Sequence, residues 1–160
     1  MSEFDAELAN IFRDESVRRL DEMDAALLAI ESGEPGAEAI DSLFRNAHTI
    51  KGAAGMVGFD DVRTLAHAVE DVLGSVRESG VFPPELAAPL LRATAVLRAQ
   101  VTGAGEVADD DLLDDLAAAL APLSDRTAGP PGAGPADPAD AGAAARTSAG
   151  PPPAARTSAG

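Results

Sequence analysis

The sequence predicts an all-α protein: an up-and-down antiparallel helical bundle with a four-helix core and a fifth, C-terminal helix. Apolar residues through residues 1–124 recur at spacings of three, four and seven, and no segment alternates as a half-buried strand does. Aromatic residues are only 3% of the chain, so Leu, Val, Ile and Ala must build most of the core. Short connections separate the periodic segments, so consecutive helices should pack antiparallel.

The first helix is expected at about residues 3–31, before the sequence SGEPG. Its apolar series comprises Phe4, Leu8, Ile11, Phe12, Leu20, Met23, Leu27 and Ile30. The second helix should run to about Met56, with Gly58 ending it in the left-handed conformation. Its apolar stripe comprises Ile40, Leu43, Phe44, Ala47, Ile50 and Ala54.

The third helix should start after Gly58, with Asp60 as its N-cap, and end near residues 79–80. Its apolar stripe comprises Val62, Leu65, Ala66, Val69, Val72, Leu73 and Val76. Pro83 and Pro84 suit the first turn of a fourth helix, which Pro89 is expected to bend. After a break at residues 102–106, five leucines between residues 112 and 123 predict a shorter fifth helix.

Composition changes abruptly near Ser124. Residues 1–124 carry the helical pattern, whereas residues 125–160 consist mainly of Pro, Gly, Ala, Ser and Thr. The hexapeptide ARTSAG occurs twice in this second part. We therefore expect a bundle over 1–124 and a disordered linker or tail over 125–160. A linker of this kind suggests a further domain beyond it or a larger parent protein, and a dispensable tail is the alternative.

The net charge of −15 excludes two classes of partner. All of the excess lies in residues 1–124, as 24 acids against 9 bases, and such a surface repels nucleic acid and anionic membranes. The chain has no Cys, so it has no disulfide or thiolate metal site. It has no long apolar run, and its start is acidic where a signal peptide is basic, so the sequence predicts a cytoplasmic protein.

The stretch HTIKGAAGMVGF, residues 48–59, contains three evenly spaced glycines. A Walker phosphate loop is excluded because Lys51 precedes Gly52, and the dinucleotide motif is excluded because no Gly-x-Gly pair is present. A helix that stops at Gly52 remains possible on propensity, since continuing through Gly52 and Gly55 costs roughly 2 kcal/mol. The residues between the glycines are poor turn formers, however, so we expect the helix to continue.

On that helix, His48, Lys51, Gly52 and Gly55 share one arc of roughly 100° beside the apolar stripe. The arc has little side-chain bulk beyond the histidine. Another molecule's backbone or phosphate could therefore approach it closely.

An antiparallel hairpin that turns near residues 58–59 places His48 level with Glu70 of the next helix, and Lys51 level with His67. His67 and Glu70 are three residues apart and share one flank. Four titratable side chains are thus expected along one seam.

Such a seam suits nucleophilic chemistry. A carboxylate that accepts a hydrogen bond from Nδ1–H of an imidazole fixes the tautomer and leaves the Nε2 lone pair free to attack. If the electrophile is a phosphoryl group, Lys51 would offset its charge. From geometry alone, however, His48 could be a packing or capping residue, His67 a structural one, and Glu70 and Lys51 ordinary surface residues. A metal site is disfavoured, since two histidines and no cysteine supply few ligands.

The segment LFRNAHTIKGAAGMVGFDDVRTLAHAVEDVLGSVR, residues 43–77, closely resembles histidine-phosphotransfer (HPt) domains. It is most like the N-terminal phosphotransfer domain of CheA-type chemotaxis histidine kinases. The motif His-Thr-Leu-Lys-Gly, the later Gly-Phe and the His-x-x-Glu of the following helix are matched, with Ile50 in place of the leucine. The resemblance extends over about residues 1–120.

The resemblance implies a phosphorelay function in chemotaxis-type two-component signalling. His48 would be phosphorylated on Nε2 by a histidine-kinase ATP-binding domain, Glu70 would orient it, and Lys51 and His67 would complete the site. The phosphoryl group would pass to an aspartate of a response-regulator receiver domain. The chain would need no cofactor of its own, because ATP and Mg²⁺ belong to the partner domains.

By this resemblance the chain is a phosphocarrier module that cannot phosphorylate itself, since nothing in it resembles a kinase catalytic domain. It could be part of a larger kinase or a stand-alone phosphotransfer protein of a non-chemotaxis relay. A purely structural interaction domain is a further alternative, which the retained site residues disfavour.

Overall fold

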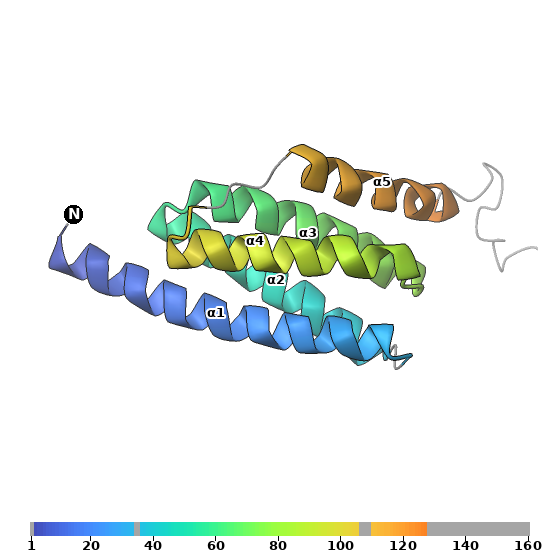
Figure 1. Cartoon of the computed structure of the whole chain (residues 1–160), viewed down its shortest axis with the longest axis horizontal. Coiled ribbons are helices and arrows are strands. Elements are labelled where there is room, and N and C mark those ends of the chain that lie inside the picture. The colour runs from blue at the N-terminus through green and yellow to red at the C-terminus, as the bar shows by residue number, and fades with distance from the viewer. Residues whose placement is uncertain (1, 34–35, 106–109, 128–160) are drawn as a thin grey trace, which may run out of the picture. The chain divides into compact units, whose positions relative to one another are not determined.

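The computed structural model describes residues 2–33, 36–105 and 110–127, with side chains described as far as residue 123. These residues form five α-helices and one short 3₁₀ helix, and the described part contains no strand (Figure 1). The helices pack antiparallel. The predicted all-α class is therefore confirmed.

Helix α1, Glu3–Glu31, begins at a capping box. The Ser2 hydroxyl accepts a hydrogen bond from the Asp5 amide, and the Asp5 carboxylate accepts one from the Ser2 amide. The expected apolar face is wrong at this end, because Phe4, Leu8 and Ile11 are 71%, 38% and 59% exposed. The first turns of α1 extend beyond the ends of the other helices (Figure 1). Leu8 and Ile11 also line a hollow beside Met56 and Val57.

Helices α2, Ala37–Val57, and α3, Asp60–Ser79, form the hairpin that the sequence predicts. Helix α2 continues through Gly52 and Gly55 and ends at Gly58, whose φ of 78° is left-handed. The predicted N-cap of α3 was wrong. Asp60 is the first helical residue of α3; the N-cap is Phe59, and it makes no side-chain capping bond.

The fourth helical segment starts as a 3₁₀ helix, η1, Pro84–Leu86, and continues as α4, Ala87–Thr102. Pro89 is the third residue of α4 and so lies in its first turn, not in the helix interior where a bend was expected. In the first turn of an α-helix the missing N–H of proline is not needed. The irregularity is the 3₁₀ turn that precedes α4.

Helix α5, Asp110–Thr127, runs three residues beyond the composition change at Ser124. It accommodates Pro122 within its length. The predicted tail lies almost entirely outside the described residues, since 128–160 are not among them. The proposed boundary at residue 124 therefore stays a prediction.

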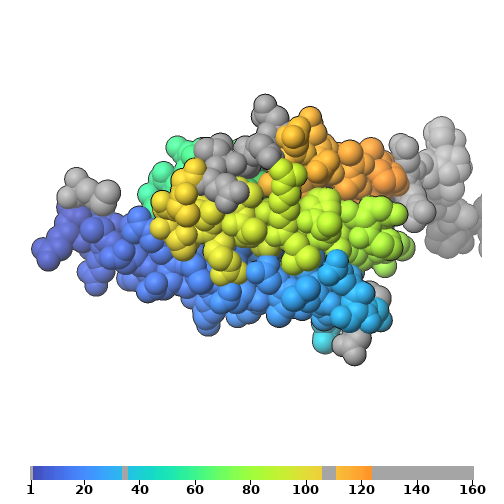
Figure 2. Space-filling model, in the orientation of Figure 1, coloured from blue at the N-terminus to red at the C-terminus, as the bar shows by residue number. Residues whose placement is uncertain are grey.

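The core is a four-helix bundle in which α1 packs on α2 and α4, and α3 packs on α2 and α4. Helix α5 lies outside this square, against α3 and α4. Figure 2 shows α4 between α1 and α5 on one face of the bundle. The predicted apolar residues of α3 are all buried, as are Leu112, Leu116 and Leu123 of α5. None of the described helices is both long and apolar enough to cross a membrane.

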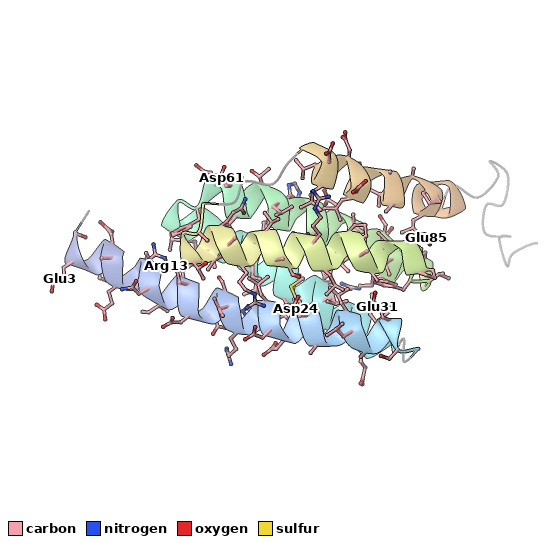
Figure 3. All side chains as sticks on the ribbon, in the orientation of Figure 1. Glu3, Arg13, Asp24, Glu31, Asp61 and Glu85 are labelled. Carbon is pink, nitrogen blue, oxygen red and sulfur yellow. The ribbon has the colours of Figure 1, made fainter. Side chains whose placement is uncertain are left out.

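A polar network fixes α4 against α1. Thr94, which is 1% exposed, donates a hydrogen bond of 2.5 Å to Asp24, and Arg98 pairs with Asp24 and Asp21 at 2.8 and 2.7 Å. Asp24 lies in the seam between the two helices (Figure 3). This network holds the side of the bundle opposite the α2–α3 hairpin.

Candidate functional site

The seam between α2 and α3 brings three of the predicted site residues into contact. Nδ1 of His48 lies 2.6 Å from Oε1 of Glu70, and Nζ of Lys51 lies 2.5 Å from Oε2 of the same carboxylate. The hairpin has the predicted register at His48 and Glu70, because the turn at Gly58 leaves both at the same height. One carboxylate therefore holds both an imidazole and an ammonium group.

The two partners of the central pair differ in exposure. The Glu70 side chain is 11% exposed, whereas the His48 side chain is 62% exposed. Burial raises the pKa of Glu70, but hydrogen bonds from Lys51 and His48 lower it by more, so the pKa lies below its ordinary value. Glu70 is accordingly an ionised carboxylate near neutral pH.

This charge state fixes the tautomer of His48. An ionised carboxylate only accepts hydrogen bonds, so Nδ1 of the neutral imidazole carries the proton. Nε2 is then left with its lone pair. No hydrogen bond within the described residues engages Nε2, so this nitrogen is free to react with a partner.

Lys51 lies one turn after His48 on α2 and is 26% exposed. Lys51, which is predicted to lie level with His67, binds Glu70 in the structure. Its positive charge therefore stabilises the carboxylate. A role of Lys51 toward a phosphoryl group on His48 stays a prediction.

His67 lies apart from these contacts. Its Nε2 is 3.6 Å from Oδ1 of Asp71, one turn later on α3, and the His67 side chain is 61% exposed. Within the described residues, no hydrogen bond or ion pair joins His67 to His48, Lys51 or Glu70. A supporting role for His67 stays a prediction.

The two glycines that follow the histidine leave the surface of α2 open. A Cβ atom at Gly52 would meet no atom within 4 Å, and one at Gly55 would contact only the Arg63 side chain, at 3.4 Å. Packing inside the bundle therefore does not require glycine at position 52. A role of Gly52 and Gly55 in giving a partner molecule access to His48 stays a prediction.

Phe44 is a neighbour of His48 that the sequence analysis assigned only to the apolar stripe. Its ring lies parallel to the imidazole within 14°, with the ring centroids 6.2 Å apart. The two residues are four apart on α2, which is the spacing that brings side chains together on a helix. The four-residue spacing was therefore the sequence signal that could have predicted the contact between Phe44 and His48.

The described residues offer little to a metal ion. No group of three or more His, Asp or Glu side chains among them is placed to hold one.

The fold and the site together define a class of protein: a helical bundle that presents one exposed histidine, held from behind by a buried carboxylate. The Hpt domain family matches residues 7–126, and the chain belongs to this family.

Individual relatives point to the same type of module. The chain is 50% identical over 56 residues to chemotaxis protein CheA of Halobacterium salinarum, which covers 35% of the chain, and 33% identical over 98 residues to CheA of Rhizobium meliloti, which covers 61%. The matched segments span only 8% and 13% of those two proteins.

A solved structure is also similar. The phosphorylated P1 domain of CheA3 from R. sphaeroides, crystallised in complex with CheY6, matches with a TM-score of 0.65 and 34% identity. The match covers 73% of this chain and 98% of that domain. The chain is thus an Hpt domain of the CheA P1 type.

Proposed function

We propose that this Hpt domain carries a phosphoryl group on Nε2 of His48 in a CheA-type chemotaxis phosphorelay. The observation that carries the proposal is the 2.6 Å contact between Nδ1 of His48 and Oε1 of Glu70. It makes one exposed imidazole nitrogen a lone-pair donor with a fixed direction.

In the first step, the Nε2 lone pair attacks the γ-phosphorus of ATP bound to a histidine-kinase catalytic domain. The N–P bond forms, the P–O bond to the leaving ADP breaks, and the imidazole becomes cationic with its proton still on Nδ1. Glu70 stabilises this cation as the charge develops. Lys51 offsets part of the negative charge that the phosphoryl group brings toward Glu70.

In the second step, a carboxylate oxygen of a receiver-domain aspartate attacks the same phosphorus. The N–P bond breaks and its electron pair returns to Nε2, which restores the neutral imidazole. The partner domains supply ATP and Mg²⁺, so the chain acts as a phosphocarrier. Gly52 and Gly55 leave room beside His48 for both partners.

The choice of receiver rests on similarity. The related P1 domain of CheA3 forms a complex with CheY6, and we infer that a CheY-type response regulator is the partner here. The kinase domain is expected to be of the CheA type. Because both partners work where ATP is available, we assign the module to the cytoplasm.

A labelling experiment tests the proposal. The chain is incubated with a CheA-type catalytic domain and γ-labelled ATP, and the label should be acid-labile and alkali-stable, as expected for phosphohistidine. The chain has two histidines, so His67→Gln is a matched control for His48→Gln. We expect label on His67→Gln and none on His48→Gln; label retained by His48→Gln would refute the proposal.

A further inference from the structure

We propose that Phe44 is a positioning residue for His48: its ring fixes the plane of the imidazole so that Nε2 faces the incoming phosphorus. The inference rests on the proposed function, because it concerns the same histidine. It adds a second constraint to the one that Glu70 provides.

The Phe44 ring stacks on the imidazole of His48. The Phe44 and His48 rings lie 14° from parallel with centroids 6.2 Å apart, within the range of offset aromatic stacking. The hydrogen bond to Glu70 fixes the position of one ring atom, Nδ1. A single contact of this kind leaves the ring free to tilt about it, and a flat neighbour limits that tilt.

Phe44 is itself held in place by residues of α3. Its Cε2 atom lies beside Gly74, where a Cβ atom would stand 3.5 Å from it, in van der Waals contact. The guanidinium of Arg77 lies over the Phe44 ring, 4.8 Å from its centroid, and Nε of Arg77 is 3.2 Å from Oδ1 of Asp41. The ring thus lies in a slot made by Gly74 and Arg77, which defines its orientation.

The functional consequence follows from the direction of the lone pair. The Nε2 lone pair lies in the plane of the imidazole, so a tilt of the ring turns it away from the phosphorus. Misalignment of a reacting pair costs rate even when both groups remain present. Phe44 therefore acts through His48, with no need to touch the phosphoryl group.

The test uses Phe44→Leu, which keeps an apolar side chain but removes the flat ring. Proton NMR of the unphosphorylated protein reports the stacking, since the ring current of Phe44 shifts the His48 imidazole protons. Phosphoramidate, a small phosphoryl donor, then reports the reactivity of the imidazole without any docking partner. We expect Phe44→Leu to lose the shift and to slow phosphorylation about fivefold, and Phe44→Tyr to restore both.

Phe59→Leu is the matched control. Phe59 is also a partly buried phenylalanine with an arginine over its ring, since the guanidinium of Arg13 lies 5.5 Å from its centroid. It lies beyond the end of α2, and that helix rises roughly 13 Å from His48 to its last residue, Val57. Phe59→Leu should lower stability through the same loss of ring packing and leave the His48 shift and the phosphorylation rate unchanged.

A second variant keeps the test decisive if Phe44→Leu fails to fold. Gly74→Val leaves Phe44 unchanged but puts two methyl groups into the slot below its ring, and the same loss of shift and rate is expected. An unchanged rate in a folded variant that has lost the shift would overturn the proposal, and so would an unchanged shift. The NMR shift is measured on the unphosphorylated protein, so it tests the stacking of Phe44 on His48 whether or not His48 is the phosphorylated residue. Failure of the proposed function would appear separately, in the labelling experiment.

Discussion

Glu70 reaches across from α3 and holds His48 of α2 by its Nδ1 atom, at 2.6 Å. The carboxylate is buried and the imidazole is exposed, so the pair presents its reactive side outward. The same carboxylate binds Lys51 through its second oxygen. This arrangement converts an ordinary surface histidine into one with a defined tautomer.

Replacing Glu70 should slow phosphorylation of His48 without unfolding the bundle. Glu70→Ala removes the group that fixes Nδ1 and stabilises the cationic ring, and we expect the rate to fall about tenfold or more. The rate for Glu70→Gln should lie between those of Glu70→Ala and the unaltered chain, because the amide oxygen still accepts a hydrogen bond from Nδ1–H but stabilises the cation less. Rates with a catalytic domain and labelled ATP, alongside helical circular dichroism, check this; an unchanged rate in Glu70→Ala would remove the orienting role.

The depressed pKa of Glu70 predicts a pH dependence of stability. A carboxyl group whose pKa is lower in the folded state stabilises the protein fully above its unfolded value and loses that contribution as the pH falls through the folded value. The ordinary value is 4.5. The free energy of unfolding of the unaltered chain should therefore exceed that of Glu70→Gln at pH 7, and the gap should close below pH 4.5. A gap that is independent of pH in urea unfolding would contradict the assigned ion pair.

Gly52 and Gly58 should respond in opposite ways to substitution by alanine. Gly52 is helical with open space at its Cβ position, so Gly52→Ala should raise the free energy of unfolding by about 0.5–1 kcal/mol. Gly58 has a φ of 78°, so Gly58→Ala should lower it by about 1 kcal/mol. Denaturant unfolding of both variants measures these changes.

The same Gly52→Ala variant tests the access role. Its methyl group would stand beside His48 on the surface that a receiver must approach, so transfer to the receiver should slow while phosphorylation by phosphoramidate is unchanged. If transfer to the receiver keeps its rate, the surface at Gly52 is not used in docking.

The α1–α4 network should matter for stability and not for chemistry. Thr94→Val preserves shape but removes the hydrogen bond to Asp24, a charged acceptor, and should cost about 1.5 kcal/mol. Phosphorylation of His48 should be unchanged, since the network lies on other helices. Thermal unfolding and labelling of the one variant measure the two effects, and a slower labelling rate would show that the two regions are coupled.

Much of the site could be predicted from sequence because it depends on one hairpin. Once Gly58 defines the turn, counting residues in both directions brings His48 level with Glu70. Helical periodicity similarly predicted the buried face of α3, since hydrophobic spacing and burial agree there.

The failures of the sequence analysis have a common physical cause. Periodicity reports which face of a helix is apolar but not how far the neighbouring helices extend, so it does not predict the exposure of Phe4 in the first turn of α1. Sequence signals locate the start of a helix only to within a residue or two. For this reason Asp60 was predicted as the N-cap of α3, and Pro89 was predicted inside a helix whose first turn it occupies. The contact between Lys51 and Glu70 depends on side-chain rotamers, which spacing along the chain does not determine.

The most direct measurement locates the phosphoryl group atom by atom. Nitrogen-15 NMR of the phosphorylated, isotopically labelled chain reports which imidazole nitrogen is bonded to phosphorus. We expect phosphorus coupling at Nε2 of His48, with the Nδ1–H still donating a hydrogen bond to Glu70. Phosphorus on Nδ1 of His48, or on His67, would contradict this expectation.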